Sequence, residues 1–177
     1  MNKIKVAKIN VVEIEQLQKI AKQTFFETFA ESNTQDNMQI YLTEGFTTEK
    51  LTSELTNQNS EFYFAEAKKE IIGYLKINFG AAQTELKDTK TLEIERIYVL
   101  KEFHGKGVGQ LLYDKAIKIA KQKNVDYVWL GVWEENQRAI HFYKKNGFVA
   151  FDKHIFKLGN DEQTDIMMKL KLDNNIA

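Results

Sequence analysis

Four stretches of the chain combine hydrophobic spacing with the end signals of helices. The first begins after Asn10 and Glu13, which have the spacing of a capping box, and its apolar residues recur every three or four positions. Further helices are expected within 48–55, over 107–123 and over 136–146. The pattern therefore predicts two helices in the first third of the chain and two in its second half.

Seven other stretches are rich in β-branched and aromatic residues, which predicts strands. They cover residues 4–8, 62–67, 71–79, 91–100, 127–132, 148–158 and 163–172. Lys68, Lys69 and Glu70 have the character of a hairpin turn between the second and third strands. A helix joins 91–100 to 127–132, and such a crossover is expected to be right-handed with parallel strands. The order predicts an α/β (α+β) fold in which helices flank a mixed, mostly antiparallel sheet.

Composition narrows the function classes. No linker or repeat divides the 177 residues, so one domain over 1–177 is expected. The absence of cysteine removes disulfides, thiolate metal sites and a cysteine nucleophile. Since 25 basic residues balance 25 acidic ones, a dedicated nucleic-acid binder is not expected. No long apolar stretch is present, and residues 1–10 lack the apolar core of a signal peptide, so we expect a cytoplasmic protein without membrane contact.

The densest chemical signal is the loop His104-Gly105-Lys106-Gly107-Val108-Gly109, between a strand and a helix. Glycines let the backbone turn tightly and present its amides, and a helix N-terminus attracts anions, so the loop suits a phosphate or pyrophosphate. A P-loop is excluded because Lys106 is followed by Gly107, and a dinucleotide fingerprint because Gln110 stands at its third glycine. A glycine-rich turn that binds nothing is the alternative.

A second constellation lies on the helix expected at 136–146. Asn136 is a good N-cap, and Tyr143 follows about two turns later, on the same side of the helix. Gly147 stands where a helix typically stops. For Tyr143, a core aromatic with its hydroxyl satisfied at the edge is the alternative to a functional role.

The two constellations together resemble the GNAT family of acetyl-CoA-dependent N-acetyltransferases. The family loop [RQ]-x-x-G-x-[GA] corresponds to His104-x-x-Gly107-x-Gly109. The later family signature N-x-x-A-x-x-[FY]-Y-x-x-x-G-F is filled by Asn136, Ala139, Phe142, Tyr143, Gly147 and Phe148. The resemblance covers nearly the whole chain and implies the GNAT fold, in which the two parallel strands splay apart.

The resemblance implies that acetyl-CoA is the co-substrate and lies between the splayed strands. The residues expected at its site are Ile97, Tyr98, Val99, His104, Gly105, Lys106, Gly107, Val108, Gly109, Asn136, Tyr143 and Lys145. The first three would pair their backbone with the pantetheine arm, and the loop amides would hold the pyrophosphate. Asn136 would bond the pantetheine, and Lys106 and Lys145 would approach the phosphates, with a solvated Lys106 as the alternative.

His104 departs from the family pattern, which usually has Arg or Gln at this position. A charged His104 at the phosphates would make acetyl-CoA binding weaken from about pH 6 to 8 as the charge is lost. Use of the backbone alone at this position is the alternative.

Tyr143 matches the family's general acid, which protonates the departing CoA thiolate. The amine's proton also needs an acceptor. Glu93 and Glu95 are two residues apart on a strand and so share a face, and either is a candidate base, directly or through a water. A solvated or ion-paired strand face is the alternative for each, and the sequence does not choose between the two.

A narrower resemblance, to the bacterial PaiA-type spermidine/spermine N-acetyltransferases, rests on residues 24–29, 51–64 and 147–165, with Asn160 where that group usually has Asp. It implies a small cationic amine, a polyamine, as acceptor. Charge agrees: residues 11–60 carry eight acids against three lysines, and 101–124 carry six lysines against two acids. Opposite charges at the two ends of one cleft would attract both substrates. Solvated helix faces are the alternative.

Other readings stay open. A GNAT enzyme could acetylate another small amine or a protein amine. A non-catalytic module could bind acyl-CoA as a sensor without transferring the acetyl group, but the intact pair of Asn136 and Tyr143 argues against such a module. No metal is expected, because His141 and His154 lack clustered ligand spacing with Asp152 or Asp165; they are read as structural or cleft-lining. Family members often form dimers, so a homodimer is one expectation, without an identified interface.

Overall fold

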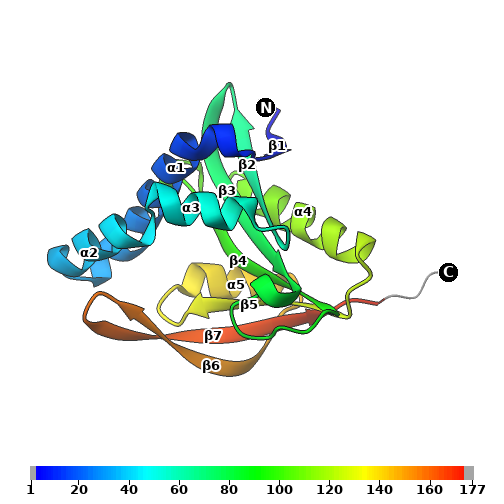
Figure 1. Ribbon diagram of the computed structural model, residues 1–177. Coiled ribbons are helices and arrows are strands. Elements are labelled where there is room, and N and C mark those ends of the chain that lie inside the picture. Colours follow the sequence, from blue (N-terminus) through cyan, green and yellow to red (C-terminus); the bar gives the residue numbers. More distant parts are fainter. Residues whose placement is uncertain (1–2, 174–177) are drawn as a thin grey trace.

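Within residues 3–173, which a computed structural model describes, seven strands form one mixed sheet in the order β1-β2-β3-β4-β5-β7-β6 (Figure 1). The strands are β1 (Lys5–Lys8), β2 (Ser60–Ala67), β3 (Glu70–Phe79), β4 (Thr91–Val99), β5 (Tyr127–Trp133), β6 (Val149–Leu158) and β7 (Asp161–Lys171). Neighbouring strands are antiparallel except β4 and β5, which are parallel. The predicted fold class is confirmed, and so is the parallel pair.

The helices are α1 (Ile14–Phe29), α2 (Gln35–Gly45), α3 (Thr48–Thr56), α4 (Val108–Gln122) and α5 (Gln137–Lys145). Asn10 and Glu13 form the predicted capping box at the short helical turn that leads into α1. Gly147 follows α5 with φ +93°, a conformation that favours glycine, as expected for a helix stop. None of the described helices has the length and apolar composition to cross a bilayer.

The prediction of two helices before β2 is wrong, because α2 is a third. Its sequence is mainly polar, and only Asn37 and Met38 of this helix are buried. A helix with so narrow an apolar stripe gives little periodicity. Thr34 caps it by accepting a hydrogen bond from the Asn37 amide at 3.2 Å, and this cap is the signal that was available.

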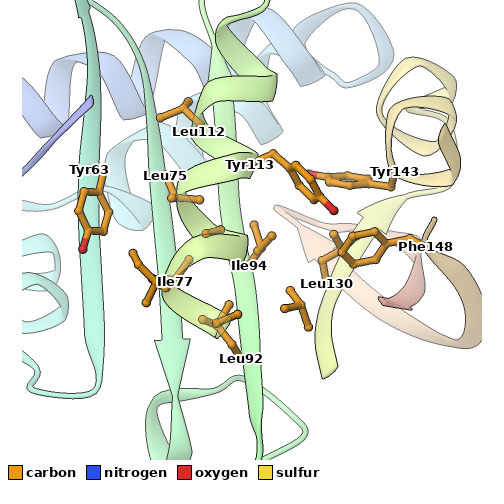
Figure 2. Close-up of a cluster of buried hydrophobic side chains, with 14 of the residues drawn as sticks. Tyr63, Leu75, Ile77, Leu92, Ile94, Leu112, Tyr113, Leu130, Tyr143 and Phe148 are labelled. Carbon is orange, nitrogen blue, oxygen red and sulfur yellow. The ribbon is translucent and has the colours of Figure 1, made fainter. Parts of the chain in front are cut away.

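Helices cover both faces of the sheet and enclose two hydrophobic clusters. On one face, α1 contacts β3 and β4, and the cluster there includes Leu17, Phe25 and Phe62. On the other face α4 packs on β3 and β4, and its cluster extends to Tyr143 of α5 (Figure 2). Figure 1 shows α1 and α3 on the opposite side of the sheet from α4. Alternating residues of the central strands thus supply two separate cores.

The parallel strands β4 and β5 separate after only three residue pairs. Thr91, Leu92 and Glu93 lie opposite Tyr127, Val128 and Trp129, and no later residue of either strand is in this register. Beyond that point β4 continues along β3, and β5 continues along β7. The sheet is therefore open in its middle toward the end of β4.

A β-bulge in β4 lies at the same place. Ile94 pairs with Ile77 and Arg96 with Lys76, so Glu95 is an extra residue. Because one extra residue shifts the alternation, Arg96 faces the same side of the sheet as Glu93. Glu93 and Glu95 were expected on one face because side chains alternate strictly along a regular strand. The bulge breaks that alternation, but both side chains still accept a hydrogen bond from Asn78.

The turn of the β6–β7 hairpin lies against α2, as Figure 1 shows. The Asn37 side chain donates to Asp161 at 3.0 Å and accepts from the Asn160 amide at 3.1 Å. Gly159 (φ +59°) passes so close that a Cβ there would lie 2.3 Å from the Asn37 side-chain oxygen. This contact joins the end of the chain to the helices near its beginning.

Candidate functional site

Two cavities open where β4 and β5 separate. One, the aromatic cavity, is lined by aromatic residues of α1, α2, β5 and β6, together with charged residues of β4 and β7. The other, the glycine-loop cavity, is lined by residues of the loop 104–109 and of α5. Ile97, Ala139 and Tyr143 line both. The two cavities therefore meet between the end of β4 and α5.

The glycine loop has the backbone that an anion site needs. Gly105 and Gly107 have φ of +72° and +80°, and Gly107 is the residue from which α4 begins. Nothing lies within 4 Å of a Cβ built at Gly105, Gly107 or Gly109, so the surface above the loop is open. The loop amides and the helix N-terminus can therefore approach a phosphate closely.

Positive charge reaches this cavity from α5 rather than from the loop. Arg138 and Lys145 both line it. Lys106 instead places its ammonium 5.1 Å from the ring centroid of Phe103. Sequence reasoning missed Arg138, although its place two residues after the Asn136 cap was a usable signal. Lys145 thus lies at the expected cavity, and its approach to the phosphates stays a prediction.

His104 lies at the cavity with its ring tied to the backbone. Its Nε2 is 2.8 Å from the Val99 carbonyl oxygen, and since a carbonyl only accepts, Nε2 carries the proton. Burial first, and then the charges of Arg138 and Lys101, lower the pKa of His104 despite that hydrogen bond. A lowered pKa opposes the positive charge on which the pH 6–8 hypothesis depends. The His104 backbone amide itself donates to the Lys101 carbonyl at 3.1 Å, so the role of this position at the phosphates stays a prediction.

Tyr143 stands at the junction of the two cavities. Its side chain is only 5% exposed, packs against Phe142 and Phe148, and points toward Tyr113 of α4 (Figure 2). Its hydroxyl makes no hydrogen bond to any described residue. Burial, and to a lesser extent Tyr113, raises the pKa of Tyr143 well above its ordinary value, so the phenol stays protonated at neutral pH. Asn136 holds the helix start by accepting from the Ala139 amide at 3.2 Å.

Glu93 and Glu95 both lie in the aromatic cavity but in different surroundings. The side-chain amide of Asn78 donates to both, at 3.0 Å to Glu93 and 2.6 Å to Glu95. Glu93 is 3% exposed and also accepts from the amide and hydroxyl of Thr84. Burial raises the pKa of Glu93, with the hydrogen bonds from Asn78 and Thr84 opposing it.

Glu95 belongs to a buried network of two cations and two anions. Lys76 lies 2.5 Å from Glu95 and 3.2 Å from Glu54, and Arg96 binds Glu54 through both terminal nitrogens at 2.8 and 3.1 Å. Burial alone would raise the pKa of Glu95, but Arg96 and Lys76 bring it below its ordinary value. The network joins α3 to β3 and β4, beside the bulge.

A third carboxylate, Asp165 of β7, lines the aromatic cavity near Glu85 and His154. His154, which lies opposite Asp165 on β6, forms an ion pair with Glu85. Burial raises the pKa of Asp165 to about 6, with Glu85 adding to the effect and His154 opposing it. The reading of His154 as a structural or cleft-lining residue agrees with this position.

Residues 14–148 match the profile of the acetyltransferase (GNAT) family. The chain belongs to the GNAT family. An uncharacterised N-acetyltransferase of Lactobacillus delbrueckii subsp. lactis is 36% identical over 172 residues, which cover 97% of this chain and 99% of that protein. The chain is accordingly an acetyl-CoA-dependent N-acetyltransferase.

Two further comparisons concern Thermoplasma acidophilum. Its spermidine N(1)-acetyltransferase is 26% identical over 175 residues, covering 97% of this chain and 99% of that protein. The crystal structure of its PaiA N-acetyltransferase in complex with coenzyme A superposes with a TM-score of 0.79 at 25% identity, covering 96% of this chain and 99% of the other. The GNAT fold is thus shared over nearly the full length.

The charge on Asp165 predicts a measurable effect on the stability of this GNAT enzyme. Folding raises the pKa of this carboxyl, so a neutral Asp165 favours the folded protein. This contribution to the free energy of unfolding is fully present below about pH 4 and is lost as the pH rises through about 6. Asp165→Asn has a neutral side chain at every pH, so the variant keeps this contribution above pH 6. We expect calorimetry at pH 7.5 to show a Tm about 2–4 °C higher than for the unmodified protein, with a smaller gain at pH 4.5. A Tm that falls at pH 7.5 would show that the carboxylate is stabilised by a partner.

Proposed function

We propose that this enzyme transfers the acetyl group of acetyl-CoA directly to a primary amine of a polyamine, such as spermidine or spermine. The observation that carries the proposal is the charge of the aromatic cavity. Four carboxylates line it, those of Glu85, Glu93, Glu95 and Asp165, against the guanidinium of Arg96 and the imidazole of His154. An excess of negative charge in a partly desolvated cavity attracts a cationic acceptor.

The aromatic walls suit the rest of a polyamine. Phe25 stacks on Tyr41 with ring centroids 4.2 Å apart, and Phe29 lies 5.0 Å from Trp133 and 6.3 Å from Phe156. Aromatic faces pack against methylene chains and also attract ammonium groups. The spermidine acetyltransferase relative supports the same acceptor class.

The negative charge comes from the sheet rather than from the helices that the sequence analysis considered. Of the eight acids in residues 11–60, Glu54 joins the buried network beside the cavity, while Glu27 binds the Lys101 amide. The carboxylates that line the cavity belong to β4, to β7 and to the segment between β3 and β4.

The glycine-loop cavity has the features that the phosphates and pantetheine of acetyl-CoA require. It offers loop amides at the N-terminus of α4, and Arg138 and Lys145 for negative charge. Because β5 leaves β4 after Glu93, the strand edge at Ile97 to Val99 is available to pair with an extended amide chain. We assign acetyl-CoA to this cavity, with its thioester at the junction with the aromatic cavity.

In the proposed reaction, Glu93 takes a proton from the acceptor amine, directly or through a water, as the amine nitrogen forms a bond to the thioester carbonyl carbon. Tyr143 gives its proton to the sulfur as the carbon–sulfur bond breaks. The raised pKa of Tyr143 keeps its donor proton in place at neutral pH. Glu93 is a better base than Glu95, because two cations bind Glu95 and lower its pKa, whereas burial raises that of Glu93.

Release of free CoA thiol tests the proposed function. Purified enzyme with acetyl-CoA is assayed across spermidine, spermine, other diamines, amino acids and lysine or N-terminal peptides. We expect the highest kcat/KM with polyamines. Transfer to peptides without transfer to any polyamine would refute the proposed acceptor, and no release above hydrolysis with any amine would refute catalysis.

The choice of base predicts a contrast between two isosteric variants. Glu93→Gln is expected to lower kcat about 100-fold or more, with the Kd for acetyl-CoA unchanged and with partial recovery at high pH, where the amine is already unprotonated. Glu95→Gln removes the same charge two residues further along β4. It should lower the Tm, because Glu95 binds Lys76 and Arg96, but keep the pH profile of kcat. The assignment fails if the Glu93→Gln enzyme keeps the unmodified kcat and pH profile.

A further inference from the structure

One carboxylate of the aromatic cavity, that of Asp165, differs from the others in its contacts. Among the described residues, nothing donates a hydrogen bond or forms an ion pair with the Asp165 side chain, whereas Glu93 has three donors and Glu95 binds two cations. The charged or titratable groups around Asp165 come from three elements: His154 of β6, Glu85 before β4 and Tyr41 of α2. His154 binds Glu85 instead.

A glycine opens the space in front of this carboxylate. A Cβ built on Gly131 of β5 would lie 3.4 Å from the Asp165 Oδ2 atom. Gly131 lines the aromatic cavity between Trp129 and Trp133. The carboxylate therefore projects over the backbone of β5, and both residues line the cavity.

The surroundings of Asp165 suit an alkylammonium group. Trp133 lies directly opposite Asp165 in the β5–β7 register, and Phe29 and Phe156 continue the aromatic wall. An ammonium placed there would gain an ion pair and the attraction of aromatic faces. Arg96, which lines the cavity, and Lys76 of the same network are already bound by Glu54 and Glu95.

A second, independent feature is a tyrosine hydroxyl that is free to bind a polar ligand in the cavity. The Tyr74 side chain is 1% exposed and lines the aromatic cavity, yet its hydroxyl makes no hydrogen bond to any described residue. This hydroxyl is not one of the fully buried polar atoms that lack a partner, so it faces the cavity, where a ligand or water can form a hydrogen bond with it. Tyr143 is in the same situation at the junction with the glycine-loop cavity.

The spacing of Glu93 and Asp165 suits a molecule with two amines. Glu93 lies level with Trp129 of β5, and Asp165 lies level with Trp133. Four residues of extended strand span about 13 Å, and the carboxylate reaches back to the level of Gly131, about 7 Å from Glu93 along the strand. Asp165 on β7 also lies two strands from Glu93 on β4, about 10 Å across the sheet. The two offsets together suit the length of a diamine or polyamine.

We infer that Asp165, over Gly131, is the binding site for the non-reacting ammonium group of the acceptor and gives the enzyme its preference for diamines and polyamines over monoamines. The inference rests on the proposed polyamine function and names the residue that binds the second ammonium group of the acceptor. While Glu93 receives the proton of the reacting amine, Asp165 binds a group that undergoes no chemistry. It is a specificity-determining residue, and its effect should appear in KM rather than in kcat.

The test compares 1,4-diaminobutane with n-butylamine, which have the same carbon chain and differ in one amine, and includes spermidine. Thiol release at saturating acetyl-CoA gives kcat and KM for the unmodified enzyme, Asp165→Asn and Glu162→Gln. The last variant removes one charge from an exposed position of the same strand. We expect Asp165→Asn to lower kcat/KM about 10- to 100-fold for the diamine and spermidine, chiefly through KM, with n-butylamine nearly unchanged. Glu162→Gln should change none of these values.

Two results would overturn the inference in distinguishable ways. If the unmodified enzyme acetylates polyamines but Asp165→Asn leaves their kcat/KM unchanged, or lowers it equally for n-butylamine, Asp165 does not read the second amine and the proposed function stands. If the unmodified enzyme acetylates no polyamine, the proposed acceptor fails, and the role of Asp165 fails with it.

Discussion

The early separation of two parallel strands is the constraint on which the rest of the structure depends. β4 and β5 share only the pairs from Thr91 to Glu93. Had they stayed paired, side chains of both cores would close the middle of the sheet, and the ends of both strands would have no free edge. Because they separate, two cavities open from opposite faces and meet at Tyr143. One gap in a hydrogen-bonded sheet thus creates both binding regions.

Buried charge holds the surroundings of this gap in place. The bulge at Glu95 would leave an acid in the interior, but Lys76 and Arg96 compensate it and also bind Glu54 of α3. A buried ion pair is costly to break because the remaining partner keeps its desolvation penalty. The network therefore fixes α3 against the bulged strand. Asn78 links Glu95, which binds two cations, to Glu93, which binds none. This difference in surroundings separates the proposed roles of the two carboxylates.

Local signals in the sequence were sufficient for much of this arrangement. The glycine loop, the Asn136 cap and the Gly147 stop each follow from backbone requirements of single residues, and the parallel pair follows from the crossover helix. The bulge could not be predicted, because an extra residue in a strand leaves the alternation locally plausible. The same applies to α2, which has few buried residues, and to the pairing of Arg96 with Glu54, which joins residues far apart in the chain. The sequence pointed to Asp165 only as a possible metal ligand, because its position over Gly131 depends on the fold.

The central claim is that the two cavities meet at Tyr143 and that its hydroxyl protonates the departing sulfur. The most direct measurement is the kcat of Tyr143→Phe, together with its Kd for acetyl-CoA from titration calorimetry. The account predicts that kcat falls about 100-fold or more while Kd stays nearly unchanged, because only a proton donor is removed. An unchanged kcat would contradict the account, and so would a loss of acetyl-CoA binding large enough to explain the lower rate.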